Sequence, residues 1–224
     1  ERRDKCNQLG IEMAEKIALE AEGLEEFEKF SFLVNWAIAS NHLDFRTVGT
    51  GYGFQMAEII EELRGCVSEG LKIDQRAVIF QKAKNSSEIL YIHDNVGEIV
   101  FDKLLIKELR KYGSSVISVL RGGPITSDAT IEDGETVGLQ EVASKIILAG
   151  PDTLGISLNE MSNQLKRGLH TADLIIAKGQ ANYYALTEYK SKVPGKIACL
   201  FRTKCEIVSN DLGETGKINV AILL

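Results

Sequence analysis

Acidic and amide side chains follow closely after two apolar runs of the chain. Asp94 and Asn95 come just after the run 89–92, and Asp128 lies a few residues past the run 116–120. Their carboxylate and amide oxygens are ligands that Mg²⁺, Mn²⁺ and similar divalent cations accept. If the two runs are neighbouring strands, they lie ~5 Å apart, and the three side chains could share one cation. Asp and Asn are also common in turns and helix caps, so a structural role stays open.

A third apolar run, 174–177, is followed by Lys178 and Gly179. The lysine would place an ammonium group at the same edge of the sheet, and the glycine would let a ligand approach the backbone closely. The helix predicted to follow, which carries Asn182, would present free N–H groups to an anion. These features favour phosphate binding. A lysine that extends to solvent beside a capped turn is the alternative interpretation.

Three further polar residues are candidates for contacting a substrate. Asn41 and Asp44 lie at the end of a predicted N-terminal helix, and Glu98 closes the segment that begins at His93. Polar capping of the helix end is the alternative role for the first two. The three histidines share no spacing that would suggest a catalytic role. The sequence also lacks a nucleophile elbow, a Walker loop and a dinucleotide-binding glycine motif.

The elements that must position these residues change in character near residue 87. Residues 1–84 repeat apolar side chains at helical spacing. Beyond them, apolar runs of strand length alternate with amphipathic stretches, at 89–92, 116–120, 146–148, 174–177, 197–201 and 218–223. This alternation predicts an α/β fold, with a mostly parallel, doubly wound sheet in a three-layer α/β/α arrangement. Ligands of such sheets collect at the carboxyl ends of the strands.

We expect two regions, a helical N-terminal cap over 1–86 and a metal-binding catalytic α/β domain over 87–224. The gap before the last apolar run is too short for a crossover helix. That run is therefore predicted to be an antiparallel strand at the edge of the sheet.

Composition excludes several classes of protein. The chain has 224 residues, a net charge of −6 and 44% hydrophobic residues, as a soluble globular protein does. No basic cluster points to nucleic acid, and no apolar run approaches the ~20 residues of a membrane span. The charged N-terminus does not resemble a signal peptide. Four cysteines without a C-x-x-C pair favour reduced thiols and a cytoplasmic location, and they argue against zinc.

Longer segments around these residues resemble the motifs of the damage-control phosphatase family, first catalogued as domain of unknown function eighty-nine. Segments 90–102, 121–130 and 178–183 resemble its three main motifs. Segments 40–45 and 204–205 resemble two smaller ones. The motifs occur in the family's order from about residue 31 to the end. The resemblance is to the stand-alone microbial, largely archaeal branch.

This resemblance implies a divalent-metal-dependent phosphatase that hydrolyses phosphomonoesters of small damaged or surplus metabolites, such as sugar phosphates. The metal ligands of the family correspond to Asp94, Asn95 and Asp128, and its phosphate-contacting lysine corresponds to Lys178. One ion of magnesium, manganese, cobalt or nickel is implied, and no organic cofactor. The implied partner is a small phosphorylated metabolite, with no nucleic acid and no membrane.

The family's two amide residues correspond to Asn182 and Asn41, and we also expect Asp44, Glu98 and Gly179 to contact the substrate. The sequence departs from the family pattern at two of its motif positions. A tyrosine stands at 184, where many relatives carry Glu, and a serine at 127, where relatives often carry Asn.

Asp94 and Lys178 are the predicted catalytic residues. The cation would polarise the phosphoryl oxygens while Lys178 neutralises developing charge. We expect direct attack by water, with an aspartyl-phosphate on Asp94 as the alternative. Two other functions remain open: a non-catalytic sensor of a phospho-metabolite or nucleotide, and a carboxyl methyltransferase. The latter would need a glycine-rich loop after the first strand, where this chain carries Asp-Asn-Val-Gly-Glu.

Overall fold

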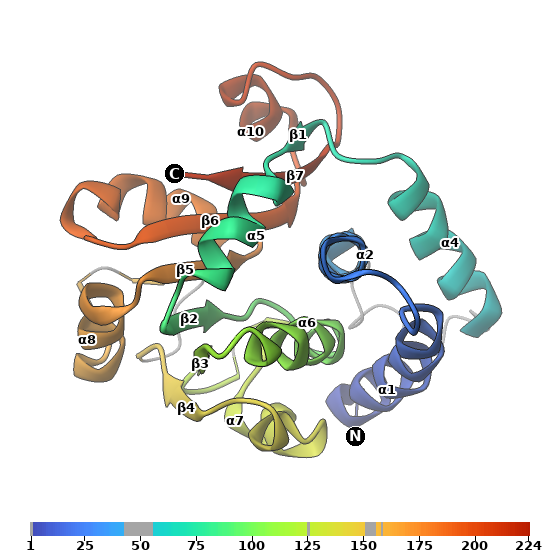
Figure 1. The fold of residues 1–224 in the computed structure, drawn as a ribbon, viewed down its shortest axis with the longest axis horizontal. Helices are drawn as coiled ribbons and strands as arrows, with labels where there is room; N and C mark the ends of the chain where they lie inside the picture. Colours follow the sequence, from blue (N-terminus) through green and yellow to red (C-terminus); the bar gives the residue numbers. More distant parts are fainter. Residues whose placement is uncertain (1, 43–55, 125, 151–155, 158) are drawn as a thin grey trace.

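A computed structural model describes residues 2–42, 56–124, 126–150, 156–157 and 159–224. Within them, seven strands form one sheet in the order β1-β7-β6-β5-β2-β3-β4 (Figure 1). The strands are β1 (Ile73–Asp74), β2 (Glu88–Ile92), β3 (Ser115–Leu120), β4 (Lys145–Leu148), β5 (Leu174–Lys178), β6 (Lys196–Arg202) and β7 (Asn219–Leu223). All neighbours are parallel except β6 and β7. The predicted α/β fold with a mostly parallel sheet is confirmed.

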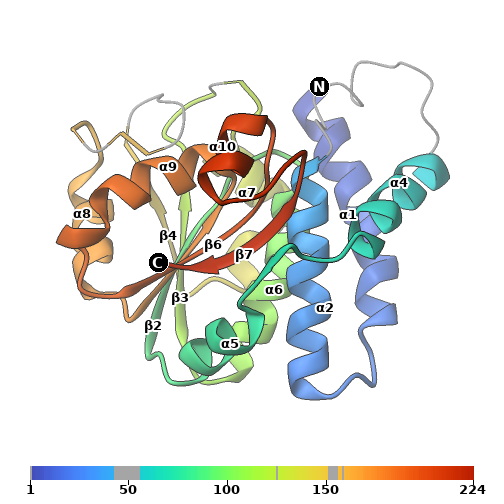
Figure 2. The same ribbon diagram turned by 90° about the horizontal axis from the view of Figure 1, so that it is seen from above.

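Helices cover both faces of this sheet (Figure 2). On one side lie α1 (Arg2–Glu20), α2 (Glu26–Ala39), α4 (Met56–Ser68), α5 (Arg76–Lys84), α6 (Ile99–Lys111) and α7 (Ile131–Thr136). On the other side lie α8 (Asn163–Thr171), α9 (Gln180–Tyr189) and α10 (Glu206–Asp211). Three short 3₁₀ turns complete the described elements: η1 (Ser40–His42), η2 (Leu139–Glu141) and η3 (Lys190–Lys192).

The central strands are buried on both faces, which explains why they read as continuous apolar runs. Alternate side chains enter two different cores. In β2, Ile89 and Tyr91 face the core beneath α2 and α6, while Leu90 and Ile92 face the core beneath α8 and α9. This alternation gives the expected three layers, and α1 and α4 add an outer shell on one side, against α6 and α2.

Two details of the predicted topology need correction. The last strand, β7, is antiparallel to β6 as expected, but it does not lie at the edge, because β1 pairs with its other side. The N-terminal region is therefore not all helical. β1 consists of only Ile73 and Asp74, too short to produce an apolar run or an alternating pattern. The backbone N–H of Lys72 and that of Gln75 donate to β7 and hold β1 in place.

The hydrophobic core crosses the predicted boundary at residue 86. One buried cluster includes Phe30 of α2 and Phe80 of α5 together with Tyr91 of β2 and Phe101 of α6. The division into regions 1–86 and 87–224 stays a prediction. Among the described helices, none combines the length and apolar character that crossing a membrane requires.

The order of the strands creates a switch point between β2 and β5. From β2 the chain crosses through α6 to β3 on one side, and from β5 it crosses through α9 to β6 on the other. Because the two connections diverge on opposite faces, the carboxyl ends of β2 and β5 are the place where sheets of this kind bind their ligands. This is the edge at which the polar candidates of the sequence were expected to meet.

Candidate metal and phosphate site

The loops after β2 and β3 are paired with one another through their backbones. Asn95 and Asp128 form an isolated antiparallel bridge. The N–H of Val96 donates to the carbonyl of Ser127 at 2.7 Å, and the N–H of Ala129 donates to the carbonyl of Asp94 at 2.8 Å. β2 and β3 are neighbours, as the sequence prediction required. The structure therefore brings the three predicted metal ligands together from two loops.

Two amide groups bridge a pair of buried carboxylates. The Nδ2 of Asn41 donates to Asp94 Oδ2 at 2.8 Å and to Glu98 Oε2 at 3.0 Å. The Nδ2 of Asn95 donates to the same two oxygens, at 2.9 and 3.0 Å. The Oδ1 of Asn95 accepts from the hydroxyl of Ser127 at 2.8 Å. Asn41, carried by η1 at the end of α2, thus reaches the sheet edge as predicted.

Lys178 lies beneath this pair of carboxylates, at the end of β5. Its ammonium group donates to Glu98 Oε1 at 2.5 Å and to Asp102 Oδ1 at 2.9 Å, and all three side chains are fully buried. Burial alone would lower the pKa of Lys178, but the two carboxylates raise it above its usual range. Its observed contacts are with acids, so the predicted contact with phosphate stays a prediction.

Asp102 anchors the buried network below Lys178. It accepts hydrogen bonds from the hydroxyl of Tyr91 at 2.8 Å, and its Oδ2 lies 2.9 Å from Nδ1 of His93. The other ring nitrogen of His93 lies 3.2 Å from the hydroxyl of Ser118. Burial would raise the pKa of Asp102, but the charge of Lys178 and the bond to His93 lower it. The network holds an ionised carboxylate against Lys178 and fixes the position of the ammonium group.

Arg121 orients Asp128 and was not identified as a site residue from the sequence. Its Nε donates to Asp128 Oδ2 at 2.7 Å, and its Nη2 donates to Asn182 Oδ1 at 3.1 Å. The Nδ2 of Asn182 donates to the carbonyl of Lys178 at 2.8 Å. One buried guanidinium therefore links the loop after β3 to α9. A charged residue directly after the apolar run 116–120 was the sequence signal for it.

Gly179 lets α9 begin beside Asp94. Its φ is +83°, in the left-handed region that favours glycine, and a Cβ atom there would lie 2.0 Å from Asp94 Oδ2. α9 starts at the next residue, so the free N–H groups of its first turn lie near the carboxylate cluster. The glycine was predicted to permit close approach of a ligand, and in the structure it also permits close approach of Asp94.

Lys204, which belongs to the segment 204–205 that resembles a family motif, is a third cation near the cluster. Its side chain is exposed, and its backbone N–H donates to Oε1 of Gln180, the first residue of α9, at 2.8 Å. Its charge acts on Asp94 and lowers the pKa of that carboxyl. Asp44, predicted to contact substrate, lies outside the described residues.

The cluster carries more buried negative than positive charge. Four carboxyl groups meet two permanent cations, all of them buried: Asp94, Glu98, Asp102 and Asp128 with Lys178 and Arg121. Burial, followed by repulsion from Glu98 and Asp128, raises the pKa of Asp94 to about 7, although Lys204 and Asn41 oppose the rise. With all four acids ionised, the excess is two negative charges, which a divalent cation would balance.

Oxygen atoms dominate the groups that could hold such a cation. In the parts of the chain that are described, no three His, Cys, Asp or Glu side chains are arranged to hold a metal by themselves. The predicted set of Asp94, Asn95 and Asp128 instead combines two carboxylates with one amide, which suits a hard ion that retains water ligands. The donor types and the excess of negative charge therefore fit a divalent cation.

The sequence matches one protein family and several archaeal proteins. The profile of the damage-control phosphatase ARMT1-like domain matches residues 1–218. An uncharacterized protein of Methanocaldococcus jannaschii is 36% identical over 98% of this chain and 71% of its own length. A damage-control phosphatase of Archaeoglobus fulgidus is 37% identical over 83% of this chain, and one of Pyrococcus horikoshii is 34% identical over 82%. The match covers 62% and 61% of those two proteins.

The fold agrees with these sequence relationships. The crystal structure of a DUF89 family protein from Pyrococcus horikoshii resembles this chain with a TM-score of 0.81 and 32% sequence identity. The similarity covers 97% of this chain and 73% of that one. The family predicted from the motifs is confirmed, and with it the assignment to a phosphatase. The chain belongs to the damage-control phosphatase family.

Proposed function

We propose that this chain is a divalent-metal-dependent phosphatase that hydrolyses phosphomonoesters of small metabolites, such as sugar phosphates. The gathering of four buried carboxyl groups around two buried cations at the β2–β5 switch point is the observation that carries the proposal. A cation there would favour the ionised form of Asp94, whose pKa is raised to about 7 by burial and by neighbouring acids. The proposed ion is one of Mg²⁺, Mn²⁺, Co²⁺ or Ni²⁺, and no organic cofactor is required.

Asp94, Asn95 and Asp128 would hold the ion. When bound, it would polarise the phosphoryl oxygens and orient the attacking water. Asn95 would have to present its carbonyl oxygen, which now accepts from the hydroxyl of Ser127. That hydroxyl can either donate or accept, so it could serve an amide in both orientations. Arg121 would keep the Asp128 carboxylate turned toward the ion, because it binds one of its two oxygens.

The phosphate group would bind at the start of α9. The free N–H groups of the first turn attract an anion, and Gly179 keeps this turn open beside Asp94. Lys204 supplies an exposed ammonium group near the carboxylates. Lys178 would act without touching the phosphate. Its ion pairs with Glu98 and Asp102 reduce the negative charge of the cluster, and so reduce the repulsion that a dianionic phosphate would meet there.

Water is the proposed nucleophile, with attack by Asp94 as the alternative. Asp94 Oδ2 already accepts from the amides of Asn41 and Asn95, and these bonds reduce the availability of its electron pairs. Acid quenching during turnover of a phosphate-labelled substrate separates the two routes. Label retained on the protein would identify an aspartyl-phosphate and contradict direct attack by water.

The test is phosphate release from a panel of phosphomonoesters after chelation and after addition of each divalent ion. Chelated protein should be inactive and should recover with at least one ion. Asp94→Ala should remain inactive with every ion, while Asp74→Ala, which removes an acid from the far end of the sheet, should retain activity. Full activity of Asp94→Ala, or binding of phosphate esters without any release, would contradict the proposal.

We also propose a cytoplasmic location, without nucleic-acid or membrane partners. None of the four cysteines forms a disulfide bond, and three of them, Cys6, Cys66 and Cys199, are buried. Burial raises the pKa of Cys199 to about 12, so this thiol is held in its unreactive form. Buried cysteines that stay outside disulfide bonds are typical of proteins that work in a reducing compartment. Thiol titration of freshly prepared protein should therefore find four reactive groups after unfolding without reductant.

A further inference from the structure

A buried asparagine on α1 joins the two loops of the candidate metal site. The Oδ1 of Asn7 accepts from the backbone N–H of Gly97 at 3.0 Å, and its Nδ2 donates to Asp133 Oδ1 at 2.9 Å. Asn7 has no exposed surface. Gly97 belongs to the loop that carries Asp94 and Asn95, and Asp133 follows the loop that carries Asp128.

The contact with Asp133 extends to Asp128 through a set of fixed hydrogen bonds. Asp133 Oδ2 accepts from the backbone N–H and the hydroxyl of Thr130, both at 2.8 Å, and so caps α7. Arg3, one turn before Asn7 on α1, also binds Asp133 and donates to the backbone carbonyl of Asp128. The segment 128–133 is thereby tied to α1 at both of its ends.

Close contact between α1 and the other loop occurs at Gly10. A Cβ atom at this position would lie 2.6 Å from the carbonyl oxygen of Gly97 and 3.1 Å from a methyl carbon of Val100. α1 therefore rests directly on the backbone that follows Asp94 and Asn95. A side chain at residue 10 would push the helix and this loop apart.

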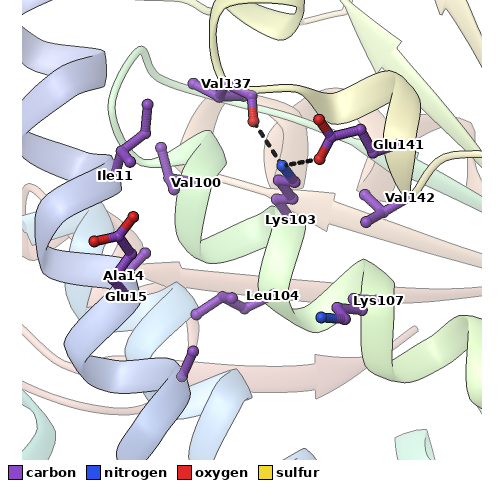
Figure 3. Close-up of a pocket in the computed structure, with 11 residues that line it drawn as sticks. Ile11, Ala14, Glu15, Val100, Lys103, Leu104, Lys107, Val137, Glu141 and Val142 are labelled. Carbon is purple, nitrogen blue, oxygen red and sulfur yellow. Dashed lines mark hydrogen bonds and ion pairs between the residues drawn. The ribbon is translucent and has the colours of Figure 1, made fainter.

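Further along α1, a pocket lies beside its contact with α6. The pocket has a volume of about 470 Å³ and is lined by α1, α6 and the segment 137–142 (Figure 3). Ile11 and Ala14 line it from α1, and Val100 and Leu104 line it from α6. The apolar packing is therefore interrupted at this pocket, although Met13 and Ile17 of α1 are buried in the core. The hydrogen bonds of Asn7 and Arg3 add to that packing in holding α1 against the two loops.

We propose that Asn7 is a positioning residue, which reinforces the backbone pairing of the two metal-bearing loops by bonding to Gly97 and Asp133 together. The inference rests on the proposed function, because it takes Asp94, Asn95 and Asp128 as the metal ligands. Asn7 touches neither ion nor substrate and acts only through the loops. Groups that orient metal ligands in this way typically change metal affinity about 10–100-fold when they are replaced.

The test measures Mn²⁺ affinity directly, by titrating the chelated full chain and following the free Mn²⁺ signal in electron paramagnetic resonance. Asn7→Leu keeps the approximate volume and removes both hydrogen bonds, so Mn²⁺ should bind about 10–100-fold more weakly. Asn219→Leu is the matched control. Asn219 is also a buried amide that bonds to two backbone carbonyls, those of Cys66 and Gly70, but it lies on β7. The Mn²⁺ affinity of the Asn219→Leu variant should stay within about twofold of that of the wild type.

Gly10→Ala provides an independent variant in case Asn7→Leu does not fold. Alanine is the better helix former, so a purely structural view predicts unchanged or higher stability. The methyl group would press on Gly97 and should weaken Mn²⁺ binding, without loss of helical circular dichroism. If Asn7→Leu folds and binds Mn²⁺ as tightly as the wild type, the inference is wrong. If only Gly10→Ala folds, wild-type Mn²⁺ affinity in that variant has the same meaning. A loss of Mn²⁺ affinity in Asn219→Leu as large as that in Asn7→Leu would also overturn the inference. Wild-type protein that takes up no Mn²⁺ would contradict the metal site itself, and this inference with it.

Discussion

Replacing Asp94 with asparagine should stabilise the metal-free protein while abolishing its metal binding. The pKa of Asp94 is raised from its ordinary value of 3.8 to about 7, first by burial and then by the charges of Glu98 and Asp128. The folded state therefore holds the Asp94 proton more tightly than the unfolded state does. This preference favours folding at low pH, and its contribution is lost as pH rises from about 4 to about 7.

The size of the effect follows from the difference between the two pKa values. At about 1.4 kcal/mol per pH unit, a rise from 3.8 to about 7 corresponds to a cost on the order of 4 kcal/mol at pH 8. Asparagine avoids this cost, because its amide is neutral and its carbonyl oxygen can still accept from Asn41 and Asn95. For a chain of 224 residues, 4 kcal/mol corresponds to a rise in Tm of roughly 10 °C.

The assay is urea unfolding of the chelated wild type and of Asp94→Asn at pH 5 and pH 8. The variant should be more stable at both, and its advantage should be about 3 kcal/mol larger at pH 8. Asp74→Asn is a control for which the expected change in stability at pH 8 has the opposite sign. The hydrogen bond from Arg76 lowers the pKa of Asp74, so this variant should lose a little stability at pH 8. An Asp94→Asn variant that is less stable than the wild type at pH 8, or an advantage that does not change with pH, would refute the reasoning.

Three further predictions concern the same buried charges. Lys178→Met leaves the carboxylates of Glu98 and Asp102 without their cation, so it should lower the free energy of unfolding by about 3–5 kcal/mol. Urea titration at pH 8 measures this loss, and a value below about 1 kcal/mol would be inconsistent with the buried ion pairs. Gly179→Ala would place a methyl group against Asp94 in a left-handed backbone, so calorimetric titration should detect no Mn²⁺ binding while circular dichroism shows the fold retained; wild-type affinity would argue against the contact. Because a proton competes with the metal for Asp94, the Mn²⁺ affinity of the wild type should fall about tenfold per pH unit below pH 7, and a flat profile from pH 5 to 7 would exclude Asp94 as a ligand.

The strands that carry the site were predictable because each is buried on both faces. The runs that became β2 and β5 are continuously apolar, that of β3 is interrupted only by the buried Ser118, and the polar residues at their ends mark where the strands stop. The alternation of strands with helices predicted a mostly parallel sheet, but the neighbours of each strand, such as β5 beside β2, came only from the structure. The two-residue β1 left no comparable signal, since its pairing with β7 depends on backbone hydrogen bonds that most residue types can make.

The network beneath the site could not be read from local patterns. Asp102 lies in an amphipathic helix, where an acid usually faces solvent, yet it is fully buried against Lys178. The two residues are separated by 76 positions in the chain, and only the arrangement of α6 and β5 brings them together. Asn7 is a similar case: nothing in the sequence of α1 distinguishes it from a surface asparagine. Side chains that position other side chains carry no motif of their own.

Both edge strands of the sheet are short, so they present few free backbone groups to another molecule. β1 has two residues, and β4 at the opposite end has four and begins with Lys145. A strand of another molecule pairs with a sheet edge through a row of free backbone N–H and C=O groups. Short or charged edge strands offer few such groups and so disfavour intermolecular pairing. Without β1, the whole of β7, Asn219–Leu223, would be open to such pairing. β1 would therefore protect β7 from aggregation. A proline at position 72, which removes the N–H that donates to Asn219 of β7, should make the protein more prone to fibril formation in a thioflavin fluorescence assay.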